Sequence, residues 1–387
     1  MSTIATSPAH NTIITATAVI DSQALLENYK QIKSLAPNSK ILAVLKANGY
    51  GHGLVRIAKL LADSLFIEEN SADAFGVARL DEALLLRAAG IVQPIVLLEG
   101  VFNQADLPIV AVNDLQIVVH NKEQLDAIIQ MPADKLLQKQ LKIWLKIDTG
   151  MHRLGIETTD FDYFYQQLQD SNNIQTPIVL MSHLACADDQ KNTSTTKQLA
   201  IFEQLTGHLN EPKSCANSAG ICAWRQSHYD WLRPGLMLYG VSPLLNADSN
   251  QNNSAQTLAI KPVMTLQASL ITIRQIKAGE KVGYGANWQA PKDTTIGVIA
   301  IGYGDGYPRH AENNTPVLIN NRIVPLVGRV AMDMITVDLG EKSTDNIGDI
   351  ATLWGENLPV EIIAKHASTI PYELLCNIKP RVQITVN

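Results

Sequence analysis

A lysine stands at the end of a short apolar segment near the start of the chain. Lys46 closes the run ILAVLK (41–46), and the glycine-rich stretch NGYGHG (48–53) follows almost directly. An amine held on a rigid strand forms a Schiff base with a carbonyl, provided that burial and neighbouring groups lower its pKa. The glycines would leave room for a cofactor. A lysine at a strand end is also commonly a surface residue whose stem covers apolar neighbours.

Three later segments carry side chains suited to proton transfer or anion binding. Tyr284 lies in KVGYGANW, Arg233 in RPG and Ser218 in ANSAG. A tyrosine with a pKa of about 10 is a poor base unless neighbouring donors or positive charge stabilise its phenolate. Arginine stays charged, and hydroxyl and backbone N–H groups bind phosphates. Each residue also has an ordinary structural interpretation. Tyr284 could pack beside a turn, Arg233 could be a surface cation before Pro–Gly, and Ser218 could belong to a helix cap.

Short apolar segments alternate with helical patterns such as SQALLENYKQIKSLA and LDEALLLRAAG. This alternation is typical of a parallel sheet, and eight strands favour a closed (β/α)8 TIM-type barrel over residues 10–245. An open doubly wound sheet remains an alternative. The candidate strands are ILAVLK (41–46), AFGVA (74–78), IVLLE (95–99), QIVVH (116–120), LKIWLKID (141–148), PIVLMSH (177–183), KSCAN (213–217) and LMLYG (236–240).

The chain changes character after the polar stretch NADSNQNNSAQ (246–256), which is predicted to be a linker or exposed loop. The segments beyond it are β-rich and separated by Gly, Pro, Asn and Asp. They predict a second, mostly antiparallel β domain over residues 255–387. The segments are VMTLQASLITIRQI, TTIGVIAIGYG, TPVLINNRIVPLVG, MITVDLG and IATLWG.

Composition excludes several kinds of protein. A chain of 387 residues exceeds the roughly 250–300 residues of one compact core, so two domains are expected. The net charge of −6 and the scattered basic residues argue against a nucleic-acid partner. The four cysteines have no disulfide or metal-site spacing. No signal peptide or membrane span is evident, so a cytoplasmic protein without membrane contact is expected.

The sequence around Lys46 resembles the cofactor-lysine signature of the alanine racemase family, which are fold-type III pyridoxal-phosphate enzymes. The match is AVLKANGYGHG, and its YGHG continuation separates it from the related barrel decarboxylases. The resemblance continues in the family's order from about residue 16 to residue 382. The further blocks are LKIDTGMHRLG (145–155), SHLACAD (182–188), CANSAG (215–220), RPGLMLYG (233–240), KVGYGANW (281–288), IGYGDGYPR (301–309) and VGRVAMDM (327–334).

The resemblance implies pyridoxal 5'-phosphate as cofactor and assigns the residues around it. Lys46 would hold the cofactor and act as the base on the D-face, and Tyr284 would act on the L-face. His183, close to Arg233, would support the tyrosine. Arg233 would face the pyridine nitrogen. Because an arginine stays charged and cannot accept that nitrogen's proton, the nitrogen would remain unprotonated and transamination would be suppressed. The phosphate would be held by Tyr50, Ser218, Gly235 and Leu236.

Substrate recognition falls by resemblance to Arg153 and the backbone of Met332, because an arginine fork matches a carboxylate. Lys146 occupies the position of a lysine that the family often carboxylates to orient that arginine. Without the modification, Lys146 would be a barrel-interior lysine paired with an acid. Asp333 and Tyr303 are expected to support the site, and no metal is expected.

One position departs from the family's pattern. After ELLC (373–376), some members carry a tyrosine that contacts the phosphate and narrows the entrance. This chain has Pro380 there, in NIKPRVQ, as in a subset of the family. The resemblance therefore assigns this chain no tyrosine here to contact the phosphate or to narrow the entrance.

The resemblance implies an alanine racemase that interconverts L- and D-alanine, either to supply D-alanine for peptidoglycan or for alanine breakdown. It also implies a homodimer in which the β domain completes the partner's site. The alternatives are a broader-specificity amino acid racemase, a decarboxylase and a non-catalytic pyridoxal-binding protein. Decarboxylases normally place a carboxylate where Arg233 stands, and the binding proteins lack the β domain. Broad racemases usually carry a secretion signal.

Overall fold

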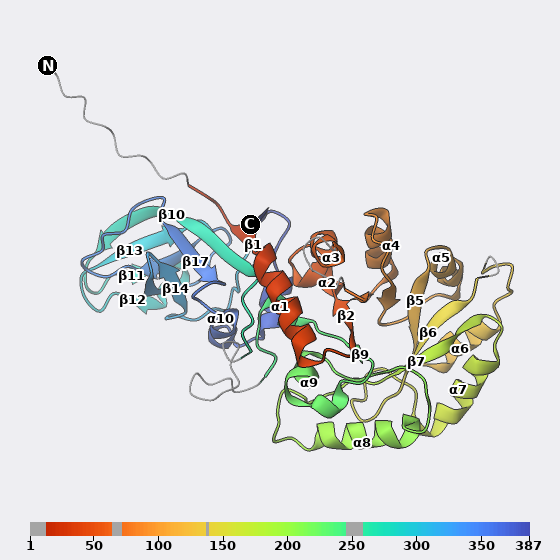
Figure 1. Cartoon of the computed structure of the whole chain (residues 1–387). Coiled ribbons are helices and arrows are strands. Elements are labelled where there is room, and N and C mark those ends of the chain that lie inside the picture. Colours follow the sequence, from red (N-terminus) through yellow and green to blue (C-terminus); the bar gives the residue numbers. More distant parts are fainter. Residues whose placement is uncertain (1–12, 64–71, 137–138, 245–257) are drawn as a thin grey trace. The chain divides into compact units, whose positions relative to one another are not determined.

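The computed structural model describes residues 13–63, 72–136, 139–244 and 258–387 (Figure 1). These fall into two compact units, Ala24–Lys261 and a second unit in which residues 13–23 join Pro262–Asn387. The expected barrel start at residue 10 differs from this division. The apolar segment TAVI forms strand β1 (Thr17–Ile20), which completes the sheet of the second unit. The predicted linker at 246–256 lies outside the described residues.

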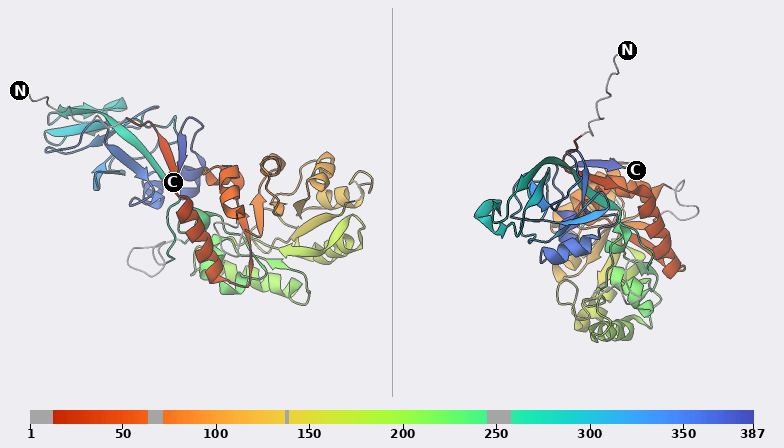
Figure 2. Two further views of the ribbon diagram at one scale, coloured as in Figure 1. Left: turned by 45° about the horizontal axis from the view of Figure 1, so that its top comes forward. Right: turned by 90° about the vertical axis from the view of Figure 1, so that its left-hand side faces the viewer.

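Among the described residues, eight parallel strands form the sheet of the larger unit and confirm the predicted barrel (Figure 1, Figure 2). Their order is β8-β7-β6-β5-β4-β3-β2-β9, and a parallel bridge between Asn217 and Arg233 joins the two ends. Most residues of β3 to β6 are buried on both faces, because helices pack outside a barrel and side chains fill its interior. They are β2 (Lys40–Val44), β3 (Ala74–Val77), β4 (Ile95–Leu97), β5 (Leu115–Val119), β6 (Leu141–Lys146), β7 (Ile174–Met181), β8 (Lys213–Ser214) and β9 (Trp231–Leu232).

The helices of this unit follow the strands in the alternation that the sequence predicts. Their buried residues recur at helical spacing, as in α1, where Leu25, Tyr29 and Ile32 lie against the barrel unit's core. None of the helices within the described ranges is long and apolar enough to cross a bilayer. They are α1 (Ser22–Leu35), α2 (Lys46–Tyr50), α3 (Leu54–Ala62), α4 (Leu80–Ala88), α5 (Leu107–Val112), α6 (Lys122–Ile129), α7 (Phe161–Asp170), α8 (Ser194–Thr206) and α9 (Ser218–Ala223).

The segment LMLYG (236–240) is not the last barrel strand, and that prediction was wrong. Leu236–Tyr239 form a buried 3₁₀ helix, η4, and β9 precedes it. A fully buried apolar run has no periodicity that distinguishes a strand from a helix. Pro234 lacks an N–H for a strand ladder, and Gly235, with φ −118° and ψ −87°, leaves the extended conformation.

The long strand β10 (Met264–Ile276) organises the β-rich unit. It pairs antiparallel with β1, β13 and β17, whereas β1 and β18 are parallel, so the predicted mostly antiparallel character is confirmed. Asn320 and Asn321, with φ of 48° and 59°, close the hairpin of β14 and β15. The other elements are β11 (Lys281–Val282), β12 (Trp288–Gln289), β13 (Thr294–Ile299), β14 (Pro316–Ile319), β15 (Arg322–Pro325), β16 (Ile335–Asp338), β17 (Ile350–Trp354), β18 (Gln383–Val386), α10 (Val360–His366) and α11 (Pro371–Cys376).

Candidate functional site

The candidate residues of the barrel unit gather at the carboxyl ends of its strands. The positive charges of Lys46, Arg153 and Arg233 all act on Lys146, so these cations share one region. In a barrel this end holds the open concavity formed by the βα loops. The residues come from different strands: Lys46 follows β2, Lys146 ends β6, His183 follows β7 and Arg233 follows β9.

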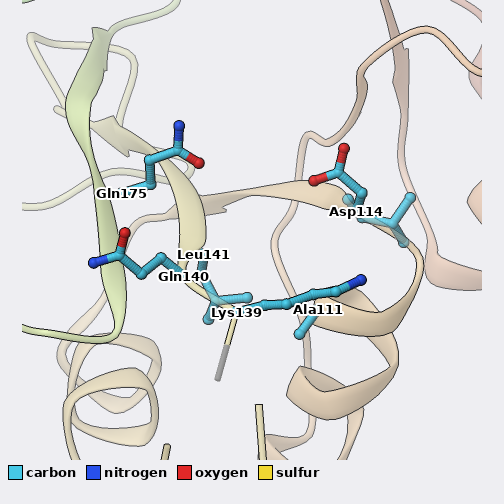
Figure 3. A pocket seen from close by; sticks show the side chains of 7 residues that line it. Ala111, Asp114, Lys139, Gln140, Leu141 and Gln175 are labelled. Carbon is cyan, nitrogen blue, oxygen red and sulfur yellow. The ribbon is translucent and has the colours of Figure 1, made fainter. Parts of the chain in front are cut away.

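A hollow of about 310 Å³ lies at the other end of the barrel (Figure 3). Its walls belong to the amino ends of β5, β6 and β7, and its carboxylate, Asp114, is paired with Lys142 at 3.0 Å. None of the candidate residues lines it, so the hollow is not the functional site. It is lined by Ala111, Asp114, Leu115, Lys139, Gln140, Leu141 and Gln175.

A left-handed turn follows Lys46. Residues 47–50 all have φ between 51° and 61°. Each non-glycine residue in this conformation costs about 1–2 kcal/mol, so contacts must hold the turn in place. Glu82 provides some of them, because one carboxylate oxygen accepts the N–H of Ala47 at 2.8 Å and the other accepts that of Ala78 at 2.9 Å. Glu82 thereby joins the turn to the loop after β3, a role that sequence reasoning missed.

Arg233 is buried, with only 4% of its surface exposed, and is therefore not a surface cation before a turn. Its Nη1 donates to the Ser214 hydroxyl, and its Nη2 donates to the carbonyls of Ser182 and Cys215. Burial lowers the pKa of Arg233 to about 10, which is still far above neutral. The guanidinium therefore stays charged and held in one orientation.

His183 lies beside this guanidinium, with its Nδ1 3.4 Å from Nη2 of Arg233. Burial lowers the pKa of His183 well below its usual value, and the positive charges of Arg233 and Lys146 act in the same direction. The ring is therefore neutral at physiological pH. Because a guanidinium only donates, Nδ1 must accept, and the ring proton is assigned to Nε2.

Hydroxyl and backbone donors converge where α9 and η4 begin. The hydroxyl oxygen of Ser218 lies 3.0 Å from the backbone nitrogen of Gly235 and 3.4 Å from that of Met237. A Cβ at Gly235 would lie 2.5 Å from the Tyr50 hydroxyl, so only glycine lets the phenol approach this backbone so closely. Such a cradle of N–H and O–H groups suits a small anion such as phosphate.

Lys146 is a buried amine surrounded by cations. Its pKa is lowered to about 8, first by burial and then by the charges of Arg233, Arg153 and Lys46, although Asp148 acts in the opposite direction. Within the described part of the chain, Lys146 forms no ion pair or hydrogen bond. The expectation of a lysine paired with an acid is therefore not met, and a substantial fraction of the amine is neutral near pH 8.

The loop after β6 carries Arg153 to the surface of the barrel mouth. Asp148 fixes this loop, because its Oδ1 accepts the backbone N–H groups of residues 150–152 at 2.8, 3.0 and 3.1 Å. Burial alone would raise the pKa of Asp148, but these hydrogen bonds lower it below its usual value. The carboxylate is therefore ionised, and no ion pair or hydrogen bond engages the Arg153 side chain within the described ranges.

Tyr284 belongs to the β-rich unit, where it begins the short 3₁₀ turn η5 (Tyr284–Ala286). Its side chain is 71% exposed, so it does not serve as a packing residue of this unit. Gly283 and Gly285 flank it with φ of 73° and 71°. A Cβ at Gly285 would lie 3.2 Å from Cζ of Arg329, which shows that this guanidinium lies against the turn.

Two loops of the β-rich unit place Met332 and Tyr303 side by side. The N–H of Tyr303 donates to the carbonyl of Ala331 at 3.0 Å, and that of Gly304 donates to the carbonyl of Met332 at 2.8 Å. Both side chains are partly exposed, Met332 at 53% and Tyr303 at 37%. The loops that carry these two predicted residues are thus joined by backbone hydrogen bonds.

Arg381 ties the same two loops together. Its Nε donates to Asp305 at 2.6 Å and its Nη2 donates to the predicted Asp333 at 2.7 Å. Arg381 directly follows Pro380, the position that departs from the family's pattern. Sequence reasoning missed Arg381 and Asp305, because the partners lie 76 and 48 residues from Arg381 and no local signal links them.

The barrel and its mouth define the class of protein. At the carboxyl ends of its strands, this parallel (β/α)8 barrel carries an amine, a buried guanidinium and an anion cradle. Functional groups at that end are typical of TIM-barrel enzymes. The family model of the alanine racemase N-terminal domain matches residues 20–243, and that of the C-terminal domain matches residues 263–386. The chain belongs to the alanine racemase family, and its activity is that of a racemase.

The relatives match along almost the whole chain. A curated alanine racemase from Photobacterium profundum is 51% identical over 370 residues, covering 96% of this chain and 99% of that protein. One from Aeromonas hydrophila is 52% identical over 367 residues, covering 95% and 98%. The crystal structure of the biosynthetic alanine racemase from Pseudomonas aeruginosa has a TM-score of 0.89 and 38% identity, covering 97% and 100%. The structure of the Bartonella henselae alanine racemase, with covalently bound pyridoxal phosphate, has a TM-score of 0.84 and 29% identity, covering 96% and 99%.

Proposed function

We propose that this chain interconverts L- and D-alanine with pyridoxal 5'-phosphate bound through Lys46. The observation that carries the proposal is the barrel mouth, where Lys46, Arg233 and the Ser218 cradle come together. The family is pyridoxal-phosphate dependent, and a related structure holds this cofactor covalently. When bound through an amine, pyridoxal phosphate stabilises negative charge at the α-carbon of an amino acid.

The described residues fit this cofactor. The anion cradle of Tyr50, Ser218 and the backbone of Gly235 and Leu236 would take the phosphate, and the glycine leaves the space that a Cβ would fill. Arg233 would face the pyridine nitrogen. A guanidinium with a pKa of about 10 cannot accept a proton there, so the ring would withdraw less charge from the α-carbon. Reprotonation at the α-carbon would then be favoured over transamination.

Racemisation needs a proton acceptor on each side of the α-carbon. Lys46 would serve the D-face and Tyr284 the L-face, since one base does not readily reach both. A phenolate needs support, and the Nε2–H of a neutral His183 is a suitable donor. The Arg153 fork and the backbone of Met332 would hold the substrate carboxylate, with Asp333 and Tyr303 supporting the loops that carry them.

Lys146 is suited to carboxylation, in which its neutral amine attacks carbon dioxide and releases one proton to give a carbamate. The carbamate would place a negative charge among the positive charges of Arg233, Arg153 and Lys46, and it would orient Arg153. Because the pKa of Lys146 is lowered to about 8, the neutral amine gains population as pH rises through 8. At fixed dissolved ¹³CO₂, the ¹³C carbamate signal should therefore increase from pH 7 to pH 9.

A matched pair of variants assigns that signal. Lys146→Ala should abolish it and raise KM for alanine, whereas Lys142→Ala, at the amino end of the same strand where Lys142 pairs with Asp114, should leave both unchanged. A carbamate signal that persists in Lys146→Ala would refute the assignment.

We further propose that the β-rich unit of a second subunit supplies Tyr284 and Met332, so that each site of a homodimer is shared. Mixing Lys46→Ala subunits with Tyr284→Ala subunits tests this directly. In a hybrid dimer, one site loses both bases and the other keeps both. Activity should return to up to about half per dimer if the two sites act independently.

The control for mixing is the doubly substituted chain combined with either single variant, which should stay inactive. If both bases came from one chain, every site of the first hybrid would carry one defect. Hybrids confirmed by mass spectrometry that show no recovered activity would overturn the shared-site proposal.

A further inference from the structure

His52 is fully buried beside the left-handed turn that follows Lys46. Its Nδ1 lies 2.8 Å from the carbonyl oxygen of Tyr50 and 3.2 Å from that of Gly49. Carbonyl oxygens only accept hydrogen bonds, so Nδ1 must carry the ring proton. The Nε2 lone pair is buried and has no hydrogen-bond partner among the described residues. Burial lowers the pKa of His52 to about 4, so the ring stays neutral.

The same ring also reaches Tyr50 through a second path. The Tyr239 ring contacts both side chains, with its centroid 4.5 Å from that of His52 and 4.8 Å from that of Tyr50. The Tyr239 hydroxyl donates to the carbonyl of Val44 at 3.2 Å, on the strand that leads to Lys46. One buried imidazole therefore holds both the backbone and the ring of Tyr50.

We infer that His52 is a positioning residue that fixes the left-handed turn and so holds the Tyr50 hydroxyl at the anion cradle. The inference follows from the carbonyl of Tyr50, whose hydrogen-bond partner is Nδ1 at 2.8 Å, whereas the carbonyl of Gly49 also accepts the backbone N–H of His52. It also follows from the tight fit at Gly235, where a Cβ would lie 2.5 Å from the Tyr50 hydroxyl. A small rotation of the turn would carry that hydroxyl away from the phosphate.

The inference rests on the proposed binding of pyridoxal phosphate, and its test measures the cofactor's dissociation constant by titrating apo protein. His52→Phe keeps a ring beside Tyr239 but removes the donor, and it should weaken binding about tenfold, as expected for one lost buried hydrogen bond. His52→Asn places an amide nitrogen near the position of Nδ1 and should restore binding to within about threefold of the unsubstituted protein. His208→Phe, at an exposed site, should change nothing.

A double-substitution cycle separates positioning from general destabilisation. If His52 acts through Tyr50, then Tyr50→Phe with His52→Phe should bind the cofactor no more weakly than Tyr50→Phe alone. Losses that multiply in the double variant, or a His52→Phe protein that binds as tightly as the unsubstituted one, would overturn the inference. If the unsubstituted apo protein showed no saturable binding of pyridoxal phosphate, the proposed function itself would fail instead.

Discussion

Replacing Lys46 by alanine is expected to reduce racemisation by at least about 10⁴-fold, because one side chain both holds the cofactor and acts as a base. The other amine of the barrel mouth, Lys146, is a buried side chain on a different strand, at the end of β6. The variant should therefore lose the visible absorbance of the bound cofactor. After borohydride treatment, peptide mapping should find no pyridoxyl group on the chain.

Lys40→Ala is the matched control. Lys40 begins the same strand β2 at its amino end, where its Nζ lies 5.3 Å from the Trp231 ring centroid. This variant should keep both the absorbance and the activity. A Lys46→Ala protein in which borohydride fixes the cofactor to another lysine would contradict the assignment of Lys46.

Tyr284→Phe is expected to slow racemisation about 10²–10⁴-fold, the range for removing a positioned acid–base group. Conversion in either direction uses one base to remove the proton and the other to return it. The equilibrium constant between enantiomers is one, so kcat/KM must fall equally for L- and D-alanine. Initial rates measured from both enantiomers should show this equal loss.

The structure offers a control for the lost hydroxyl. Tyr163 is 49% exposed on α7, where its ring centroid lies 5.6 Å from Nζ of Lys122, and Tyr163→Phe should retain full activity. Because the Tyr284 side chain is 71% exposed, its hydroxyl adds little to the packing of its own unit. A Tyr284→Phe protein with lower thermal stability and unchanged kcat would show that the residue is structural.

The barrel was predictable because its strands are continuous buried apolar runs separated by amphipathic helices. Most of ILAVLK and of LKIWLKID lies in strands, β2 and β6 respectively. LMLYG failed because burial on all sides removes the periodicity on which the prediction depends. The placement of β1 in the β-rich unit was also missed, since its partners β10 and β18 lie more than 200 residues away in the chain.

The candidate site likewise contains residues that the sequence could predict and residues that it could not. Lys46, Arg233 and Ser218 stand in local blocks with a recognisable order of residues, so their location at the barrel mouth could be anticipated. Glu82 and Arg381 could not, because each acts through a partner distant in the chain. His52 was visible in the signature, but its role depends on the left-handed backbone, which no residue pattern revealed.

The central claim is that Lys46 and Tyr284 act on opposite faces of the α-carbon, and exchange of the α-proton with deuterated water tests it most directly. Racemisation rates cannot distinguish the two bases, because conversion in either direction uses both. Exchange of the α-proton with retained configuration needs only the base on one face of the α-carbon. With Tyr284→Phe, D-alanine should still incorporate deuterium through Lys46, while incorporation into L-alanine should be lost. Equal losses from the two enantiomers would contradict the two-base account.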